Sequence, residues 1–374
     1  MGVGEDFKLF CDNLTVNNRS DISDRYETIT QRLNTDFWGS NSKTNHSLYV
    51  GSYGRGTARR GFSDLDMIFI LPPDLYKRYN NNYTYNGQSR LLEAVKNSIK
   101  NRYSATDVSG DGQVVVVSFS DSMRFEVVPA FENTDYSFTY PDSNGGGNWK
   151  ITNPRPEIAS INNNNILTNG NLVNLCRMTR AWKKSWDVQI GGLLIDTLAC
   201  KFLRSWADKE KSYYYYDWMV RDFFEYLVNQ NPKQQYWLAV GSNQYIWRKG
   251  SFEYNAKRCF NLALEAIEYE SKQMIWSANK KWREIYGTTF PVKPRKNSDI
   301  TVWESQIREC YGRVVWTHKT HEKCADIYAA QLKALKTTEI VLSALTTTSL
   351  LTSIFVAQRW GIIIGTLLST LLLG

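Results

Sequence analysis

The spacing of hydrophobic and polar positions changes along the chain and separates a mixed N-terminal region from a helical one. Residues 5–38 and 88–102 carry apolar side chains at helical spacing and predict amphipathic helices. Short runs of β-branched and aromatic residues predict strands at 46–52, 64–71, 113–119 and 123–131. This order of elements predicts a mixed sheet covered by helices.

Helical spacing dominates the second half of the chain. Residues 132–170 are rich in Asn, Gly and Pro and predict a long crossover with a turn at TNPRPE. Four helices are expected next, at 171–187, 193–207, 216–229 and 252–284, and a linker at 286–299 precedes a further helix at 301–336. We therefore expect an α+β protein with a sheet-containing core at 1–150, a helical domain at 151–290, a linker and helix at 291–337 and a distinct C-terminal segment at 338–374.

Two uncharged apolar runs make up the C-terminal segment. As helices, the first, 340–357, would span about 27 Å, close to a bilayer core, and the second, 361–374, only about 21 Å. The runs are separated by the residues QRW and predict a membrane hairpin; a buried core helix followed by an apolar tail is the alternative. The second run stops at Gly374 before it reaches spanning length, so we expect the sequence to be a truncated version of a longer protein.

The net charge and the cysteine content indicate which kinds of partner and which cellular compartment suit the protein. The formal net charge of +8 suits an anionic partner such as a nucleotide, a nucleic acid or an anionic lipid, although a solvated basic surface explains it equally well. The six cysteines are scattered without a CxxC pair, which is typical of a reducing compartment. Lysines precede the first apolar run and place the large soluble part in the cytoplasm by the positive-inside rule: Lys319, Lys323, Lys333 and Lys336.

Two aspartates on one predicted strand are the first candidate chemistry. Alternate strand residues share a face, so Asp64 and Asp66 project together with Cα atoms about 7 Å apart. Like charges repel at this distance unless a cation lies between them, and Mg²⁺ prefers carboxylate and phosphate oxygens. Exposed edge-strand aspartates are the alternative.

A third carboxylate is needed for two-metal phosphoryl transfer. Glu126, on the predicted strand 123–131, is the favoured candidate, and Asp121, which falls in the preceding turn, is its competitor. A structural ion pair between Glu126 and an arginine is the other interpretation. The sequence thus predicts a Mg²⁺ or Mn²⁺ site at Asp64, Asp66 and Glu126.

The stretch GSYGRGT precedes the aspartates and predicts a phosphate-binding turn. Its glycines allow the backbone N–H groups to approach an anion, and Ser52, which follows Gly51, can donate to a phosphate oxygen. The GK[ST] ending of a Walker motif is missing, so a P-loop NTPase is excluded. Glycine turns alone are unspecific, but the order GS, then DxD on a strand, is much more specific.

Taken together, the motifs of the chain resemble those of a known enzyme family. GSYGRGT…SDLD, FEVVPAF, TNPRP and NLVNLCRMTRAWKK together are similar to the cGAS/DncV-like nucleotidyltransferases of bacterial anti-phage signalling (CBASS), the SMODS-domain enzymes. The resemblance implies a polymerase-beta-like nucleotidyltransferase fold with the nucleotide between a sheet domain and a helical domain. It also implies synthesis of a cyclic di- or trinucleotide from ATP, GTP or pyrimidine triphosphates, with release of pyrophosphate and no nucleic-acid template. The family has Asp more often than Glu at the third carboxylate, and Glu126 departs from that pattern.

The resemblance also implies that the helix LVNLCRMTRAWKKSW faces the triphosphate. Arg177, Arg180 and Lys184 follow each other at i, i+3 and i+7 and share one helix face, with Lys183 beside it. A basic face opposite a phosphate cradle suits a triphosphate clamp, with Arg180 and Lys183 ranked first by analogy; a solvated basic face is the alternative.

The C-terminal residues 304–351 resemble the start of a SLATT domain, a two-span effector module. This resemblance implies a pore-forming or membrane-damaging effector in phage defence. We further expect the chain to be anchored in the bacterial inner membrane and its spans to assemble with one another. Two alternatives to a cyclic-oligonucleotide synthase stay open: a catalytically inactive, membrane-anchored nucleotide sensor, and a template-independent nucleotidyltransferase that makes linear oligonucleotides or modifies small molecules.

Overall fold

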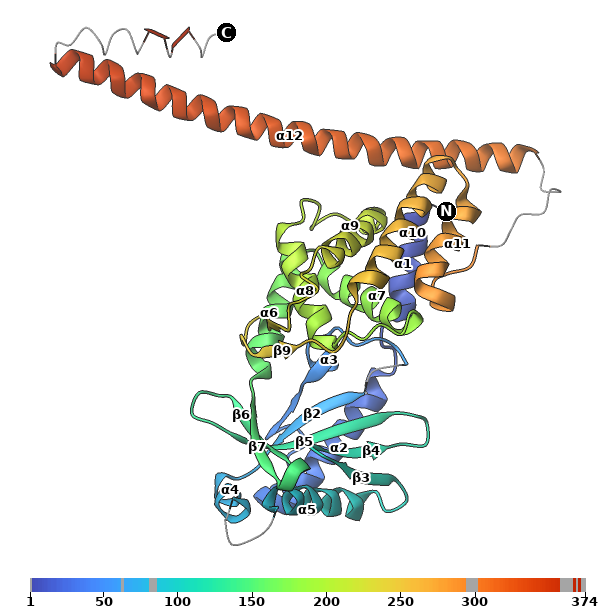
Figure 1. Ribbon diagram of the computed structural model, residues 1–374, viewed down its shortest axis with the longest axis vertical. Coiled ribbons are helices and arrows are strands. Elements are labelled where there is room, and N and C mark those ends of the chain that lie inside the picture. The colour runs from blue at the N-terminus through green and yellow to red at the C-terminus, as the bar shows by residue number, and fades with distance from the viewer. Residues whose placement is uncertain are drawn as a thin grey trace. The chain divides into compact units, whose positions relative to one another are not determined.

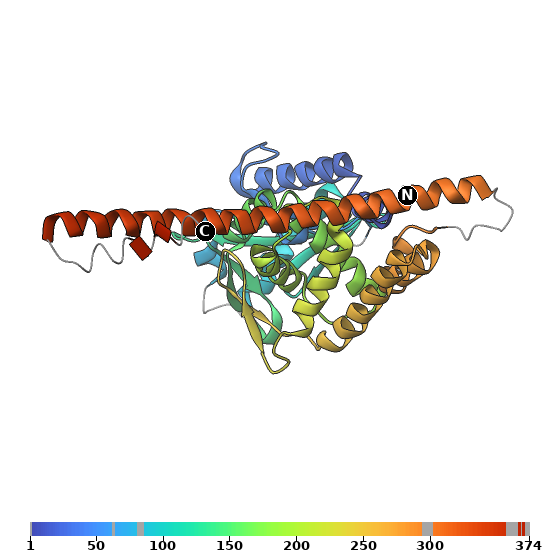
Figure 2. The ribbon, with the colours of Figure 1, turned by 90° about the horizontal axis from the view of Figure 1, so that it is seen from above.

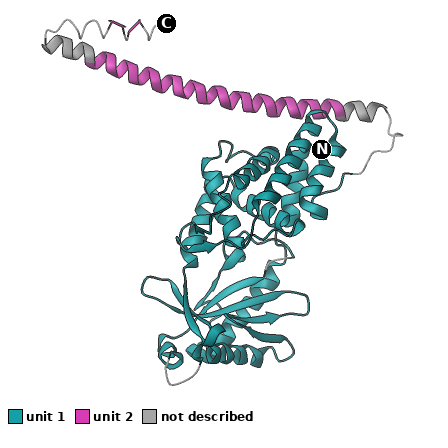
Figure 3. Cartoon of the chain, viewed as in Figure 1, with its two compact units in different colours: residues 1–296 teal, residues 297–374 magenta. Residues whose placement is uncertain are grey.

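The protein is described here from a computed structural model that covers residues 2–61, 64–80, 86–293, 302–356, 366–367 and 369–370 (Figure 1). The chain divides into two compact units, Met1–Lys296 and Asn297–Gly374 (Figure 3). The first unit contains a sheet lobe and a helical lobe, and the second contains one long helix.

The described strands of the sheet lobe form a seven-stranded mixed sheet. The main path runs in the order β1-β2-β5-β4-β3, and a β6–β7 hairpin continues from β5. Only the β2–β5 pair among the described strands is parallel, which makes equivalent residues of these two strands neighbours. The strand bounds are β1 (Ser47–Tyr49), β2 (Leu65–Ile70), β3 (Asp107–Asp111), β4 (Val114–Ser118), β5 (Arg124–Glu132), β6 (Phe138–Asp142) and β7 (Asn148–Thr152).

Two helices cover one face of this sheet. Buried side chains of α2 (Arg19–Trp38) and α5 (Gly87–Arg102) pack on Leu65, Met67 and Phe69 of β2 and on inward residues of β4 and β5. Because strand side chains alternate, Asp66 points to the opposite face. The hydrophobic core therefore fixes the side of the sheet on which the carboxylates lie. The short helices α3 (Gly51–Gly54) and α4 (Pro73–Tyr79) precede and follow β2.

The helical lobe has its own core, which includes the N-terminal helix. Phe7 and Phe10 of α1 (Val3–Leu14) are completely buried among residues of the helical lobe. The expected single helix at 5–38 is wrong, because the chain breaks between α1 and α2 and sends the two halves to different cores. The other helices of this lobe are α6 (Pro154–Leu167), α7 (Asn171–Ser185), α8 (Gly192–Ser205), α9 (Tyr216–Val228), α10 (Glu253–Ser271) and α11 (Ile275–Tyr286), with the hairpin β8 (Tyr236–Leu238) and β9 (Tyr245–Trp247).

Two further expectations are corrected by the structure. The predicted crossover at 132–170 contains the β6–β7 hairpin and α6; its glycines make the hairpin turn, and Pro154 starts the helix. The predicted helix at 252–284 is divided into α10 and α11, because Gln273 adopts a left-handed conformation with φ of 60°.

The second unit is dominated by α12 (Val302–Val356), which Figure 2 shows as one continuous helix. It unites the expected helix at 301–336 with most of the first apolar run. Within the part of the chain that the structure describes, no helix has both the length and the apolar character needed to cross a membrane. Most of the second apolar run, 361–374, lies outside the described residues, as does part of the predicted linker.

Candidate active site

A pocket of about 510 Å³ is lined by residues from both the sheet lobe and the helical lobe. The residues that sequence reasoning assigned to the site and that line this pocket are Gly51, Ser52, Asp64, Asp66, Arg180, Lys183 and Lys184. Its lining also contains residues that were not predicted: Arg55, Arg59, Asp187, Gly192, Leu193 and Ile195. The pocket thus brings the glycine turn, the aspartates and the basic helix together.

The pairing of β2 with β5 places two carboxylates side by side. Asp66 lies opposite Glu126 in the parallel register, so the two carboxylates are neighbours on the same face of the sheet. Burial, followed by the charge of Glu126, raises the pKa of Asp66 to about 7, and burial with the charge of Asp64 raises the pKa of Glu126. Burial and the neighbouring carboxylates thus both favour the protonated form of Asp66 near neutral pH.

Asp64 lies immediately before β2, and its side chain is half exposed. Arg124 lies between Asp64 and Glu126: its Nη2 donates to Glu126 at 2.9 Å, and its Nε is 3.9 Å from Asp64. The Arg124–Glu126 ion pair is the arrangement expected under the alternative given above, in which Glu126 is paired with an arginine for structural reasons. The competitor Asp121 is instead bound by both terminal nitrogens of Arg25, at 2.8 and 2.9 Å.

The donor set fits a hard divalent cation in its chemistry. Asp66 and Glu126 are paired on neighbouring strands and Asp64 stands just before β2; after burial, the charges of neighbouring carboxylates add to the rise in the pKa values of Asp66 and Glu126, and a cation would relieve that repulsion. Among the described residues, however, no cluster of three or more His, Cys, Asp or Glu side chains is arranged to hold a metal ion. The guanidinium of Arg124 instead lies between two of the three carboxylates, those of Asp64 and Glu126.

The glycine turn is fitted to Asp66. Gly51 has a left-handed φ of 59°, and a Cβ at this position would lie 1.7 Å from Oδ2 of Asp66. The backbone N–H of Val50 also donates to the carbonyl of Asp66 at 2.9 Å. The turn and the aspartate therefore approach so closely that only glycine is accommodated at position 51.

The basic side chains divide into two groups. Lys183 is partly buried, and its pKa is lowered by burial and then by Lys249 and Arg180, so positive charge is concentrated there. Lys184 is exposed at the same pocket, and Arg59, which is buried, has its pKa lowered by burial and by Arg180. These three side chains form the basic side of the pocket.

The other two predicted basic residues bind protein groups. Arg177 is not part of the pocket lining; it donates to the carbonyls of Gly56 and Ala58 at 3.0 and 3.2 Å and so holds the loop after the glycine turn. Arg180 lines the pocket, but its terminal nitrogens donate to both oxygens of Asp196 and to the carbonyls of Cys176 and Gly192. Four of its five N–H donors are thus used.

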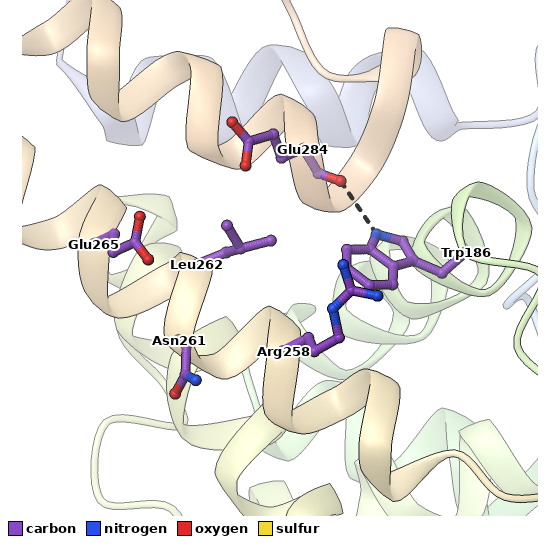
Figure 4. A pocket seen from close by; sticks show the side chains of 6 residues that line it. All are labelled: Trp186, Arg258, Asn261, Leu262, Glu265 and Glu284. Carbon is purple, nitrogen blue, oxygen red and sulfur yellow. Dashed lines mark hydrogen bonds between the residues drawn. The ribbon is translucent and has the colours of Figure 1, made fainter.

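A second hollow lies within the helical lobe, between the end of α7 and helices α10 and α11 (Figure 4). It has a volume of about 440 Å³. Arg258 stacks on Trp186 there, 4.7 Å from the ring centre, while Glu265 and Glu284 supply acidic groups. This second hollow is not lined by the glycine turn or by Asp64 and Asp66, so the pocket between the lobes is the stronger candidate. Glu126 is not among the residues that line the pocket between the lobes, although it is paired with Asp66.

Three residues at or beside the pocket were not predicted from the sequence: Arg55, Thr57 and Asp196. Arg55 and Thr57 stand inside GSYGRGT, in which only Gly51 and Ser52 were assigned to the site. Asp196 is the one acidic residue in the apolar stretch GLLIDTLAC, and it is completely buried. An isolated acid in an apolar run requires a buried partner, and that signal could have identified it.

Two family models match this chain. Residues 1–165 match the Second Messenger Oligonucleotide or Dinucleotide Synthetase domain (SMODS). Residues 303–374 match family 4 of the SMODS and SLOG-associating 2TM effector domains (SLATT). Both resemblances expected from the motifs are confirmed. The first match contains the glycine turn and the three carboxylates, whereas α7 lies beyond it.

A curated relative covers both lobes in part. A probable cyclic nucleotide synthase of Bacillus cereus (strain VD146) is 26% identical over 254 residues, which are 64% of this chain and 74% of the relative.

Solved structures share the fold at low identity. CdnC of Escherichia coli MS115-1, in complex with HORMA-deltaN, matches with a TM-score of 0.57 and 14% identity over 76% of this chain and 96% of that one. The same E. coli protein has been solved with ATP. The Vibrio cholerae DncV cyclic AMP-GMP synthase, in complex with the linear intermediate 5′ pppA(3′,5′)pG, matches with a TM-score of 0.51 and 14% identity over 66% of this chain and 69% of that one. These likenesses confirm the expected α+β fold, a mixed-sheet nucleotidyltransferase domain with a helical domain.

Proposed function

We propose that this chain, a nucleotidyltransferase that carries a second-messenger oligonucleotide or dinucleotide synthetase domain and a SLATT family 4 domain, makes a cyclic di- or trinucleotide from nucleoside triphosphates in anti-phage defence. The observation that carries the proposal is the pocket between the lobes, which is lined by the glycine turn, Asp64, Asp66 and Lys183, with Glu126 paired to Asp66 on the next strand. A pure nucleotide sensor has no need for three neighbouring carboxylates beside its phosphate site.

The reaction assigned to the pocket is phosphodiester formation. A ribose 3′-hydroxyl of one nucleotide attacks the α-phosphorus of another, a P–O bond forms, and the bond to the β-phosphate oxygen breaks with release of pyrophosphate. A second round between the ends of the linear product closes the ring. The E. coli and V. cholerae proteins with this fold were solved with ATP and with a linear pppApG intermediate, which supports triphosphates as substrates here.

Each group of side chains has a part in this step. The turn at Gly51 and Ser52 is assigned to the phosphates through backbone N–H groups, and Lys183 and Lys184 to the negative charge of the departing pyrophosphate. We assign to Glu126, whose pKa is raised by burial, the uptake of the proton of the attacking hydroxyl.

We assign a Mg²⁺ requirement, which Mn²⁺ also satisfies, to the same carboxylates. Asp64, Asp66 and Glu126 would hold the ion, and Arg124 would have to leave the position between Asp64 and Glu126. When bound, the ion supplies charge stabilisation to the phosphoryl oxygens and to the attacking oxygen.

The test of the proposed function is the mass of the product. Purified full-length protein is incubated with all four nucleoside triphosphates and Mg²⁺ or Mn²⁺, and the products are analysed by mass spectrometry. We expect a cyclic di- or trinucleotide and pyrophosphate. Linear oligonucleotides as the final product, or nucleotide binding without turnover, would contradict the proposal and favour one of the two alternatives.

We also propose that the chain is held at the bacterial inner membrane by its SLATT family 4 domain, with the synthetase domain in the cytoplasm. The match over residues 303–374 supports this, because that family is described as a two-span effector. The measurement is fractionation of cells that express the full chain. We expect the protein in the membrane pellet after an alkaline carbonate wash; release into the supernatant by that wash would contradict membrane anchoring.

A further inference from the structure

A buried carboxylate joins the two lobes beside the pocket. Asp196 of α8 is completely buried, and its Oδ2 accepts from Nε of Arg55 at 2.8 Å and from the hydroxyl of Thr57 at 2.9 Å. Both oxygens also accept from Arg180 of α7, at 2.6 and 2.9 Å. One side chain thus receives donors from the loop after the glycine turn and from the helix that carries Lys183.

Glu157 of α6 extends this cluster. It lies 3.7 Å from Nη1 of Arg55 and accepts from the hydroxyl of Ser242 at 2.8 Å. Burial by itself would raise the pKa of Asp196, but the charges of Arg180 and Arg55 lower it to about 2. The cluster therefore contains two guanidinium groups and an ionised aspartate, with Glu157 beside them.

Stability is a weak explanation for such a cluster. Burying charges costs free energy that their attraction only partly returns, and apolar replacements of similar volume are often as stable. The geometry, however, is specific. Arg55 and Arg180 both line the pocket, and Arg180 also donates to the carbonyl of Gly192, the first residue of α8 and itself part of the lining.

We propose that Asp196 is a positioning residue for nucleotide binding: by holding Arg55, Thr57 and Arg180 at once, it fixes the distance across the pocket between the glycine turn and Lys183. In this arrangement Arg180 links α7 to α8, since its terminal N–H groups donate to oxygens of Asp196 and Gly192. The inference rests on the proposed function, because it assigns the pocket to a nucleoside triphosphate.

The direction in which the nucleotide Kd changes in Asp196→Asn distinguishes a positioning role from a purely electrostatic one. Asp196→Asn removes a negative charge beside an anion site, so electrostatics alone would tighten the binding of a triphosphate. Loss of positioning would weaken it. We expect the Kd for a fluorescent N-methylanthraniloyl derivative of ATP, measured with the full chain and Mg²⁺, to rise at least tenfold. The KM for nucleotide should rise by the same factor, while kcat falls less than fivefold.

Two controls keep the test decisive. The double variant Asp196→Asn/Arg180→Gln removes both partners of one ion pair, so thermal stability should recover while the Kd stays high; recovery of both would reduce the cluster to a stabilising role and overturn the proposal. Thr57→Val removes a single donor with little change of shape, and we expect about a threefold rise in Kd at an unchanged unfolding temperature. If Asp196→Asn does not fold, an unchanged Kd of Thr57→Val overturns the proposal.

A further comparison shows which inference has failed. Lys183→Ala removes a charge assigned to direct phosphate contact, so the Kd should rise about tenfold while the unfolding temperature stays close to that of the wild type. If wild-type protein binds no nucleotide, the proposed function fails. If the wild type binds and Asp196→Asn binds equally or more tightly, only the positioning role fails.

Discussion

Asp66→Asn is expected to abolish product formation while leaving the fold intact. Asp66 is the more buried of the two aspartates, lines the pocket and is paired with Glu126 on the neighbouring strand. Removal of a carboxylate that would hold the ion should lower the rate at least about 10³-fold, which corresponds to about 4 kcal/mol of transition-state stabilisation. The measurement is the rate of pyrophosphate release by the full chain with nucleoside triphosphates and Mg²⁺.

Asp121→Asn is the matched control. It makes the same change at the competing acid, which is bound by Arg25 at the surface, and synthesis should stay within about twofold of the wild type. Full activity in Asp66→Asn, or equal losses in the two variants, would contradict the assignment of the carboxylates.

For the metal-free protein, we expect the stability of the Asp66→Asn variant, relative to the wild type, to depend on pH. The pKa of Asp66 is raised from 3.8 to about 7 in the folded protein, chiefly by burial and then by Glu126, so folding favours the protonated form. The contribution of this group to the free energy of unfolding is therefore complete below about pH 4 and is lost as the pH rises through 7. Asn cannot ionise, so Asp66→Asn should be more stable than the wild type at pH 8, by up to about 4 kcal/mol, since the pKa rises by about three and each pKa unit corresponds to about 1.4 kcal/mol. The difference should shrink as the pH falls and vanish only below about pH 4, and a difference independent of pH would contradict this explanation.

Gly51→Ala is expected to have the second-largest effect. The new Cβ would lie 1.7 Å from Oδ2 of Asp66, so the turn or the carboxylate must move. A displacement of about 1 Å at a reacting centre costs roughly 100-fold in rate, and we expect a loss of that size in pyrophosphate release. The left-handed φ of 59° adds about 1–2 kcal/mol of backbone strain.

Gly39→Ala is the control for that strain. Gly39 ends α2 with a φ of 62°, and no atom lies within 4 Å of the position of its Cβ. It should lose similar stability, measured by denaturant unfolding, and keep its rate of synthesis. If Gly51→Ala is also fully active, the close approach of the turn to Asp66 has no part in catalysis.

Local patterns in the sequence were enough to identify the motifs of the site. GSYGRGT and the alternation at Asp64 and Asp66 depend on a few consecutive residues, because a turn and a strand face are local properties. The position of Glu126 followed from strand alternation in the same way. The structure adds the parallel register, which makes Glu126 the direct neighbour of Asp66.

The ends of the helices and the elements against which they pack were harder to predict from the sequence. Residues 5–38 have one continuous helical pattern, yet α1 and α2 pack into separate cores, since tertiary contacts and not local spacing decide where a helix ends. The Asn- and Gly-rich residues 132–170 have a weak periodicity that concealed the β6–β7 hairpin and α6. Both errors occurred where local signals were compatible with more than one structure.

The sequence by itself predicted a glycine turn, a set of carboxylates and a basic helix, and it identified the two families that residues 1–165 and 303–374 match. Only the tertiary structure decided that two of the predicted basic residues, Arg177 and Arg180, bind protein oxygens. Arg177, Arg180 and Lys184 share one helix face in the sequence pattern, but the fold brings Asp196 against Arg180 and the loop carbonyls against Arg177. The physical reason is that a guanidinium binds the acceptors that surround it, and those acceptors come from segments far away in the chain.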